Sequence, residues 1–200
     1  MPEVKRDPAH KENMRRRIIY LAGFMGSGKT TIGPKLASRL DFDFVDIDNL
    51  MEEHEGISIP KIFEKFGERY FRNLEKDTLV EISKRERDMV VALGGGTLTM
   101  KENRNLIHKG GILVYLKTEP LDILSRVSGK EDRPMLLAGD GSRMSQEELE
   151  VRITSLLKER EKHYLEANIV VNTSNVNIEK SVEEIISKLS AESFRIGEVL

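Results

Sequence analysis

The chain has 200 residues, of which 38% are hydrophobic and 33% charged, a balance that predicts one globular domain with a full hydrophobic core. Its 32 lysines and arginines against 34 acids give a net charge of −2, which excludes the broad basic field of a nucleic-acid or anionic-membrane binder. The absence of cysteine excludes disulfides, thiolate metal sites and cysteine nucleophiles.

Both ends of the chain are polar. Residues 1–17 carry charges of both signs and are expected to form a flexible N-terminal tail; a basic arm for nucleic acid is the disfavoured alternative, because acidic residues dilute its charge. Residues 191–200 are expected to form a C-terminal tail, which leaves one domain at 18–190. No apolar run approaches the ~18 residues of a membrane span and no secretory signal pattern is present, so we expect a cytoplasmic protein.

The first predicted strand, Ile18–Ala22, leads into a glycine loop with the sequence GFMGSGKT at Gly23–Thr30. The glycines let backbone N–H groups turn inward around a phosphate, and Lys29 adds a cation for the β- and γ-phosphates. Thr30 supplies a hydroxyl for Mg²⁺, and the helix expected at Lys29–Leu40 directs its positive dipole end at the same place. The pattern therefore indicates nucleotide binding, with a plain tight turn as the alternative.

Short apolar runs alternate with helix-period segments along the rest of the chain. Strands are expected at Ile18–Ala22, Phe42–Ile47, Met89–Leu93, Ile112–Leu116 and Ile169–Val171. Helices are expected at Thr30–Leu40, Ile59–Lys84, Lys101–His108, Glu119–Val127, Gln146–Tyr164 and Ile178–Leu189. This alternation predicts an α/β fold with a mostly parallel sheet covered on both faces, and ligands at the carboxyl ends of the strands.

Two acidic side chains, Asp46 and Asp48, lie at the carboxyl end of the second strand, in FVDIDNL. On a continuing strand they would project to the same side, where one would hold a metal-bound water and the other accept a hydroxyl proton. The alternative is a pair of capping aspartates before a helix that begins near Asn49. The third strand has no acid at its end, so Asp46 is the available carboxylate for a metal.

Three glycines, Gly94, Gly95 and Gly96, follow the third strand. They form either a turn that needs positive φ or a place where backbone approaches a ligand without intervening side chains. Their position at the carboxyl end of a central strand, next to the glycine loop, favours a small polar substrate.

Arginines provide candidate anion ligands on the helices. Arg72 and Glu75 lie three residues apart and so share one face of a predicted helix. They form either a surface ion pair or a site in which Glu75 orients the Arg72 guanidinium to bind a carboxylate at two points. Arg160, in KEREKHY, taken singly is better interpreted as a solvated arginine on a charged helix. Residues 128–145 lack periodicity and are either a lid or a plain surface loop; on a lid, Arg133 would neutralise charge on a transferred phosphoryl group.

Taken together, these segments resemble the shikimate kinase family over about Ile18 to Leu189. The resemblance rests on six stretches in this order: GFMGSGKTTIG, FVDIDNLMEE, IFEKFGERYFRNLE, ALGGGT, RPML and KEREKHY. It implies a three-layer P-loop kinase fold, a five-stranded parallel sheet of order 2-3-1-4-5, a lid and a substrate-binding helical region. It also implies transfer of the ATP γ-phosphoryl group to the 3-hydroxyl of shikimate, giving shikimate 3-phosphate and ADP, in the chorismate pathway to aromatic amino acids.

The resemblance also implies residue roles. The catalytic set is Lys29, Asp48 and Arg133. The ATP-binding set is Gly26, Ser27, Gly28, Lys29, Thr30, Thr31, Arg126 and Arg133, with Arg126 against adenine. The shikimate-binding set is Asp48, Arg72, Gly94, Gly95, Gly96 and Arg160, with Glu75 orienting the site. Mg²⁺ is the expected cofactor, served by Thr30 and, through its water shell, by Asp46.

The sequence departs from the family pattern after Arg133, where the segment up to Arg160 is longer than usual. The loop NTSNVNIEK after the last strand lacks the proline that often flanks adenine there. Alternatives are another small-molecule kinase of this fold, such as a gluconate kinase, and a non-catalytic nucleotide-binding relative. We expect a monomer with small-molecule ligands and neither nucleic-acid nor membrane partners.

Overall fold

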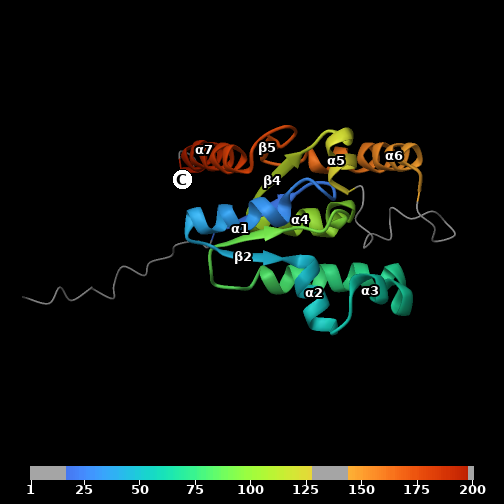
Figure 1. Ribbon diagram of the computed structural model, residues 1–200. Coiled ribbons are helices and arrows are strands. Elements are labelled where there is room, and N and C mark those ends of the chain that lie inside the picture. The colour runs from blue at the N-terminus through green and yellow to red at the C-terminus, as the bar shows by residue number, and fades with distance from the viewer. Residues whose placement is uncertain (1–16, 128–143, 198–200) are drawn as a thin grey trace, which may run out of the picture.

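The structure is a computed structural model that describes residues 17–127 and 144–197 of the chain (Figure 1). Five parallel strands form one sheet in the order β2-β3-β1-β4-β5. The strands are β1 Ile18–Ala22, β2 Asp43–Asp46, β3 Met89–Ala92, β4 Ile112–Lys117 and β5 Ile169–Asn172. The predicted fold class, strand number and strand order are confirmed.

Helices connect every strand to the next. They are α1 Lys29–Leu40, α2 Ile47–Glu55, α3 Ile59–Ile82, α4 Lys101–Gly110, α5 Pro120–Val127, α6 Gln146–Tyr164 and α7 Ile178–Gly197, with a short 3₁₀ helix η2 at Thr97–Thr99. Most boundaries agree with the sequence expectations to within two residues, and two differences change the interpretation. The chain turns into α2 directly after β2, and α7 continues beyond the expected end into the segment assigned to the C-terminal tail.

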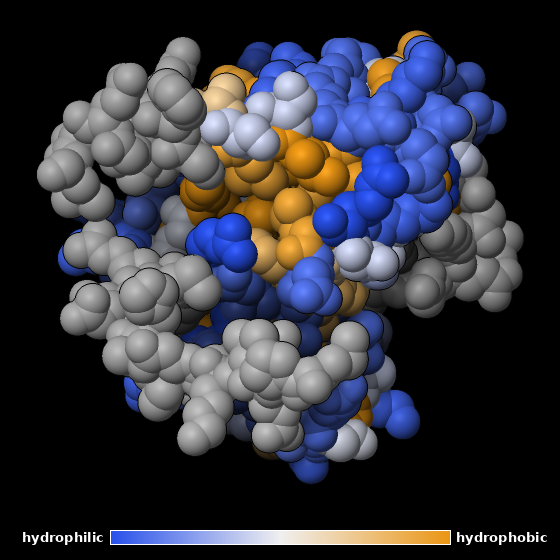
Figure 2. All heavy atoms as spheres, turned by 90° about the vertical axis from the view of Figure 1, so that its left-hand side faces the viewer, coloured by the Kyte–Doolittle hydropathy of each residue, from blue (hydrophilic) through white to orange (hydrophobic). Residues whose placement is uncertain are grey.

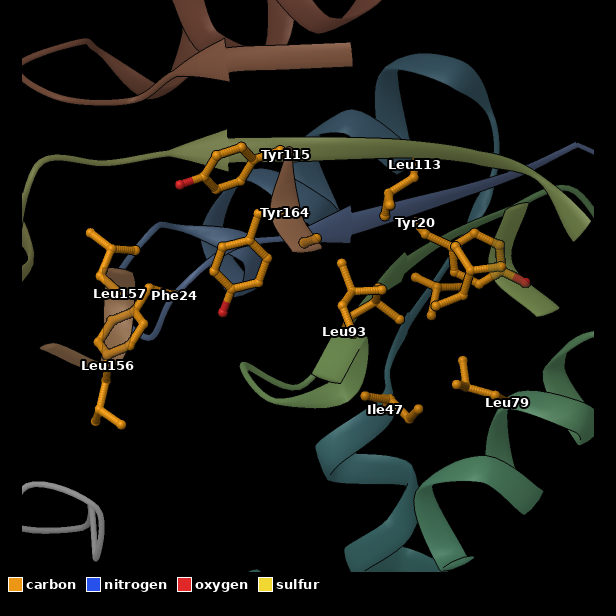
Figure 3. Close-up of a cluster of buried hydrophobic side chains, with 14 of the residues drawn as sticks. Tyr20, Phe24, Ile47, Leu79, Leu93, Leu113, Tyr115, Leu156, Leu157 and Tyr164 are labelled. Atoms are coloured by element: carbon orange, nitrogen blue, oxygen red, sulfur yellow. The ribbon is translucent and has the colours of Figure 1, made fainter. Parts of the chain in front are cut away.

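The sheet is covered on both faces, because its strands β1 and β3 are apolar and buried at every position. Along β1, Ile19 and Leu21 pack toward α1 and α7, whereas Tyr20 packs into the opposite cluster with α3, α4 and α6. Figure 3 shows part of that second cluster, in which side chains from the strands meet those of the covering helices. The result is three layers, with α2 and α3 at one end of the molecule and α6 and α7 at the other (Figure 1).

Parallel strands place all of their carboxyl ends at one edge of the sheet. β1 runs into the glycine loop, β2 into α2, and β3 into the three glycines. The groups predicted to carry chemistry therefore meet at the carboxyl edge.

Figure 2 shows the other side of the molecule, at which the chain enters β1. There, hydrophobic residues gather at the centre of the view and hydrophilic residues lie around them.

A kink at Gly67 divides α3 into two segments. Gly67 has φ 78° and ψ 174°, a conformation that residues with a Cβ rarely adopt. Before the kink, Ile62 packs with Met51 of α2 and with Phe71 in a small satellite cluster. After the kink, α3 carries Arg72 and Glu75 toward the three glycines.

Candidate active site

The glycine loop joins β1 to α1 and forms one wall of a cavity of about 500 Å³. Gly28 sits at the N-cap of α1 with φ 100°, and the amide N–H of Ser27 donates to the Phe24 carbonyl at 3.1 Å. Lys29 curls back over this loop, donating from Nζ to the carbonyls of Gly23 at 2.8 Å and Phe24 at 3.1 Å. A nucleotide phosphate placed here would meet backbone N–H groups, a helix N-terminus and an ammonium.

Most of the residues predicted to bind ATP line this single cavity. They are Gly26, Ser27, Gly28, Lys29, Thr30, Thr31 and Arg126, joined there by Asp46, Asp48 and Gly95 from the neighbouring strand ends. Arg133 lies outside the described residues, as does most of the predicted lid at 128–145.

Asp46 ends β2 and caps α2. Its Oδ1 accepts the backbone N–H of Asp48 at 3.0 Å and that of Asn49 at 3.4 Å. The expectation that Asp46 and Asp48 project to the same side of one strand is wrong, because the strand ends at Asp46 and helix α2 begins at Ile47. The capping alternative therefore describes Asp46, although both carboxylates still line the cavity.

Asp48 lies in the first turn of α2 with its carboxyl group largely buried. Burial, followed by the nearby Asp46 carboxylate, raises the pKa of Asp48 to about 6, while the Lys29 ammonium acts to lower it. Its Oδ1 has no hydrogen-bond partner within the described part of the chain. A buried acceptor with a pKa near neutrality is suited to take a proton from a bound hydroxyl.

The three glycines lie against charged side chains, which crowd the space that a Cβ would take at Gly94 and at Gly96 but not at Gly95. A Cβ at Gly94 would stand 2.9 Å from Asp48 Oδ1 and 3.1 Å from Glu75 Oε1. A Cβ at Gly96 would stand 3.0 Å from Arg72 Nη2, and one at Gly95 would stand 3.8 Å from the backbone nitrogen of Met25. The turn is thus surrounded by the predicted substrate residues and adjoins the glycine loop.

Arg72 reaches this turn from α3 and is held by Glu75. The Arg72 Nη1 atom donates to Glu75 Oε2 at 3.1 Å, and the Glu75 side chain is only 1% exposed. Thr97 donates its hydroxyl to Glu75 Oε1 at 2.6 Å, and Asn103 adds a longer contact of 3.5 Å. Burial raises the pKa of Glu75, whereas the Thr97 and Arg72 contacts lower it. Sequence analysis missed Thr97 and Asn103; the position of Thr97 directly after the glycines was the one available signal.

Arg160 reaches the same turn from α6, on the opposite side of the site. It is 7% exposed and donates from Nη1 to the Gly95 carbonyl at 3.2 Å, with its guanidinium carbon 5.8 Å from the ring centre of Phe24. The interpretation of Arg160 as a solvated surface arginine is therefore wrong. The structure brings Arg72 and Arg160 to one turn, as a clamp on a single organic anion requires.

Arg126, at the end of α5, ties the glycine loop to the last strand. Its Nη1 donates to the Gly26 carbonyl at 3.0 Å and its Nη2 to the Thr173 carbonyl at 2.8 Å. The Thr173 hydroxyl also pairs with that of Thr118 at 2.7 Å. Thr173 lines the cavity together with Val176, Ile178 and Ser181, none of which sequence analysis identified.

The chain is similar to known shikimate kinases over most of its length. A family model described as shikimate kinase matches residues 25–190. Shikimate kinase of Chlorobaculum tepidum is 46% identical over 172 residues, covering 86% of this chain and 90% of the relative. Shikimate kinase of Chlorobium limicola is 44% identical over 168 residues, covering 84% of each. A structure of shikimate kinase from Acinetobacter baumannii in complex with shikimate gives a TM-score of 0.80 at 35% identity, covering 88% of this chain and 94% of that one.

Proposed function

Because this chain belongs to the shikimate kinase family, we propose that it transfers the γ-phosphoryl group of ATP to the 3-hydroxyl of shikimate through the residues gathered at its carboxyl-edge cavity. The products are shikimate 3-phosphate and ADP. Phosphoryl transfer demands little covalent chemistry from a protein, so the residues act mainly by positioning and by neutralising charge.

The glycine loop binds the triphosphate. Backbone N–H groups of Gly26 to Gly28 surround the β-phosphate, and Lys29 exchanges its present contacts with the Gly23 and Phe24 carbonyls for phosphate oxygens. Arg126, held between the loop and β5, borders the base end of the cavity. Arg133, which lies outside the described residues, is the proposed lid arginine over the phosphates.

The donor set at the phosphate end of the cavity fits Mg²⁺. A hydroxyl from Thr30 and carboxylate oxygens from Asp46 are the oxygen ligands that this ion prefers, and Asp46 uses only Oδ1 for its cap. The described residues contain no cluster of three or more His, Cys, Asp or Glu side chains placed as metal ligands, and Mg²⁺ bound with a nucleotide needs only one or two protein groups. When bound, Mg²⁺ neutralises charge on the β- and γ-phosphates.

Asp48 accepts the proton of the 3-hydroxyl. Its unpartnered Oδ1 faces the three glycines, and its pKa of about 6 leaves it mostly ionised at neutral pH while keeping it basic enough to hold a proton. The deprotonating oxygen then attacks the γ-phosphorus, and Lys29 stabilises charge on the transferred group.

Arg72 and Arg160 bind the carboxylate of shikimate. Two guanidinium groups fixed by Glu75 and by the Gly95 carbonyl can each donate to a carboxylate with little further ordering. The glycines provide backbone N–H groups to the ring hydroxyls. Within the described part of the chain, the amides of Gly95 and Gly96 donate to no protein acceptor.

One observation carries this proposal. The turn at Gly94 to Gly96 lies within contact distance of Asp48, Arg72 and Arg160 and adjoins the glycine loop at Met25. This grouping supports a base, Asp48, and two arginines that can bind a carboxylate, beside a loop that can bind phosphate. Phosphoryl transfer to a small hydroxy acid needs these groups together. The test is product identification: incubation with ATP, Mg²⁺ and shikimate, followed by ³¹P NMR, should give a phosphate monoester at the 3-position. A phosphate at another position, or none, would contradict the assignment.

Membership of the shikimate kinase family supports a role in the chorismate pathway to aromatic amino acids. We propose, as the sequence led us to expect, that the protein acts as a monomer in the cytoplasm. No helix within the described ranges has the length and apolar character needed to cross a bilayer.

A further inference from the structure

Tyr164, the last residue of α6, lies behind the three glycines. It is 2% exposed, and its hydroxyl donates to the Gly95 carbonyl at 2.5 Å. Arg160, one turn earlier on the same helix face, donates to that carbonyl at 3.2 Å. A carbonyl oxygen has two lone pairs, so α6 saturates this acceptor with two donors.

Fixing the Gly95 carbonyl fixes the peptide group that follows it. The structure has no cis peptide bond in its described ranges, and in a trans peptide the next N–H points away from the carbonyl. With its carbonyl directed at α6, Gly95 therefore turns the Gly96 N–H away from α6. The glycines have no side chains of their own to hold them, so this orientation depends on outside contacts.

The Tyr164 hydroxyl is a reliable donor at neutral pH. Burial raises the pKa of Tyr164 to about 12, although the Arg160 charge acts in the opposite direction. The phenol therefore stays protonated at the near-neutral pH of an enzyme assay.

The chain provides a matched comparison in Tyr115 of β4. The rings of Tyr115 and Tyr164 stack with centroids 5.1 Å apart and an interplanar angle of 26°, and their hydroxyls point in different directions (Figure 3). The buried Tyr115 hydroxyl has no hydrogen-bond partner within the described ranges. The two residues thus share one packing environment and differ in whether the hydroxyl reaches the glycine turn.

We infer that Tyr164 is a positioning residue for the organic-acid half of the site: its hydroxyl holds the Gly95 carbonyl, and with it the glycine turn and Arg160, in the orientation that receives shikimate. This inference rests on the proposed function. It assigns Tyr164 no contact with substrate.

The test compares Tyr164→Phe with Tyr115→Phe in steady-state kinetics. Each substitution removes one hydroxyl and keeps the stacked ring. Loss of one neutral hydrogen bond should raise the KM for shikimate by about three- to tenfold in Tyr164→Phe. The KM for ATP should stay unchanged in that variant, and Tyr115→Phe should match the wild type in both.

Wild-type protein that fails to phosphorylate shikimate overturns the proposed function and this inference with it. Active wild type with an unchanged shikimate KM in Tyr164→Phe overturns the positioning role alone, and so does an equal loss of affinity for both substrates. If thermal unfolding shows Tyr164→Phe to be destabilised, the affinities for shikimate and ATP are measured by calorimetry in the cold, where the variant is folded, and the same selective loss is expected.

Discussion

Gly94 lies so close to Asp48 that a Cβ on the glycine would stand 2.9 Å from the aspartate Oδ1. This contact joins two segments far apart in sequence, the start of α2 and the turn after β3. The contact places the candidate base, Asp48, against the backbone of the glycine turn, which has no side chains. The glycine loop, Arg72 and Arg160 lie around the same turn.

Asp48→Asn should abolish most of the turnover while leaving ATP binding intact. Removing a general base lowers kcat by about 100- to 10,000-fold, and the amide still fits the same space. The kcat and the equilibrium affinity for ATP are measured on the same protein. Asp43→Asn, at the exposed start of β2, is the matched control and should behave as wild type. Near-normal kcat in Asp48→Asn would rule out its role as base.

Lys29→Ala should remove activity by withdrawing the ammonium from the phosphates. A fall in kcat/KM of at least about a hundredfold is expected from loss of a preorganised charged donor. The control is Lys35→Ala on the same helix, whose exposed side chain pairs with Glu179 outside the cavity. Equal losses of kcat/KM in the two variants would show that activity depends on the total charge of α1 and not on the position of Lys29 at the glycine loop.

Arg72→Ala should weaken shikimate and spare ATP. Loss of a charged two-point contact costs on the order of 1.5–3 kcal/mol, which is roughly a 10- to 150-fold rise in KM for shikimate. Because Arg72 also partners the buried Glu75, some loss of stability is expected and is followed by thermal unfolding. Arg69→Ala, on the exposed side of α3, controls for removing a positive charge from this helix. An unchanged shikimate affinity in Arg72→Ala would disprove the clamp.

The fold and the nucleotide half of the site were largely readable from the sequence. Apolar runs such as that of β1 mark strands buried on both faces, and the glycine loop is a local pattern. The organic-acid half depends on contacts between distant segments. Arg160 meets Gly95 across 65 positions, so its burial is invisible in the charged stretch KEREKHY, which by itself resembles a solvated helix face. Asp46 caps α2 because the backbone becomes helical at Ile47. The two-residue spacing between Asp46 and Asp48 does not show whether the strand continues or a helix begins.

Asp48→Asn should also stabilise the ligand-free, metal-free protein near neutral pH. The folded-state pKa of about 6 exceeds the ordinary value of 3.8, so the stability associated with protonated Asp48 is fully present below about pH 4 and is lost as pH rises through about 6. Asparagine stays neutral throughout. The variant should therefore gain up to about 3 kcal/mol of unfolding free energy at about pH 8 and less than about 1 kcal/mol at about pH 4. Denaturant unfolding at the two pH values measures this difference, and an equal gain at both would show that the charge of Asp48 is not its cause.

The central claim is that the cavity selects a carboxylated hydroxy acid beside ATP. The most direct measurement is ADP release by the purified protein with ATP and Mg²⁺, using shikimate and gluconate as alternative acceptors. We predict rapid turnover with shikimate and only background release with gluconate. Turnover on gluconate without turnover on shikimate would contradict the account.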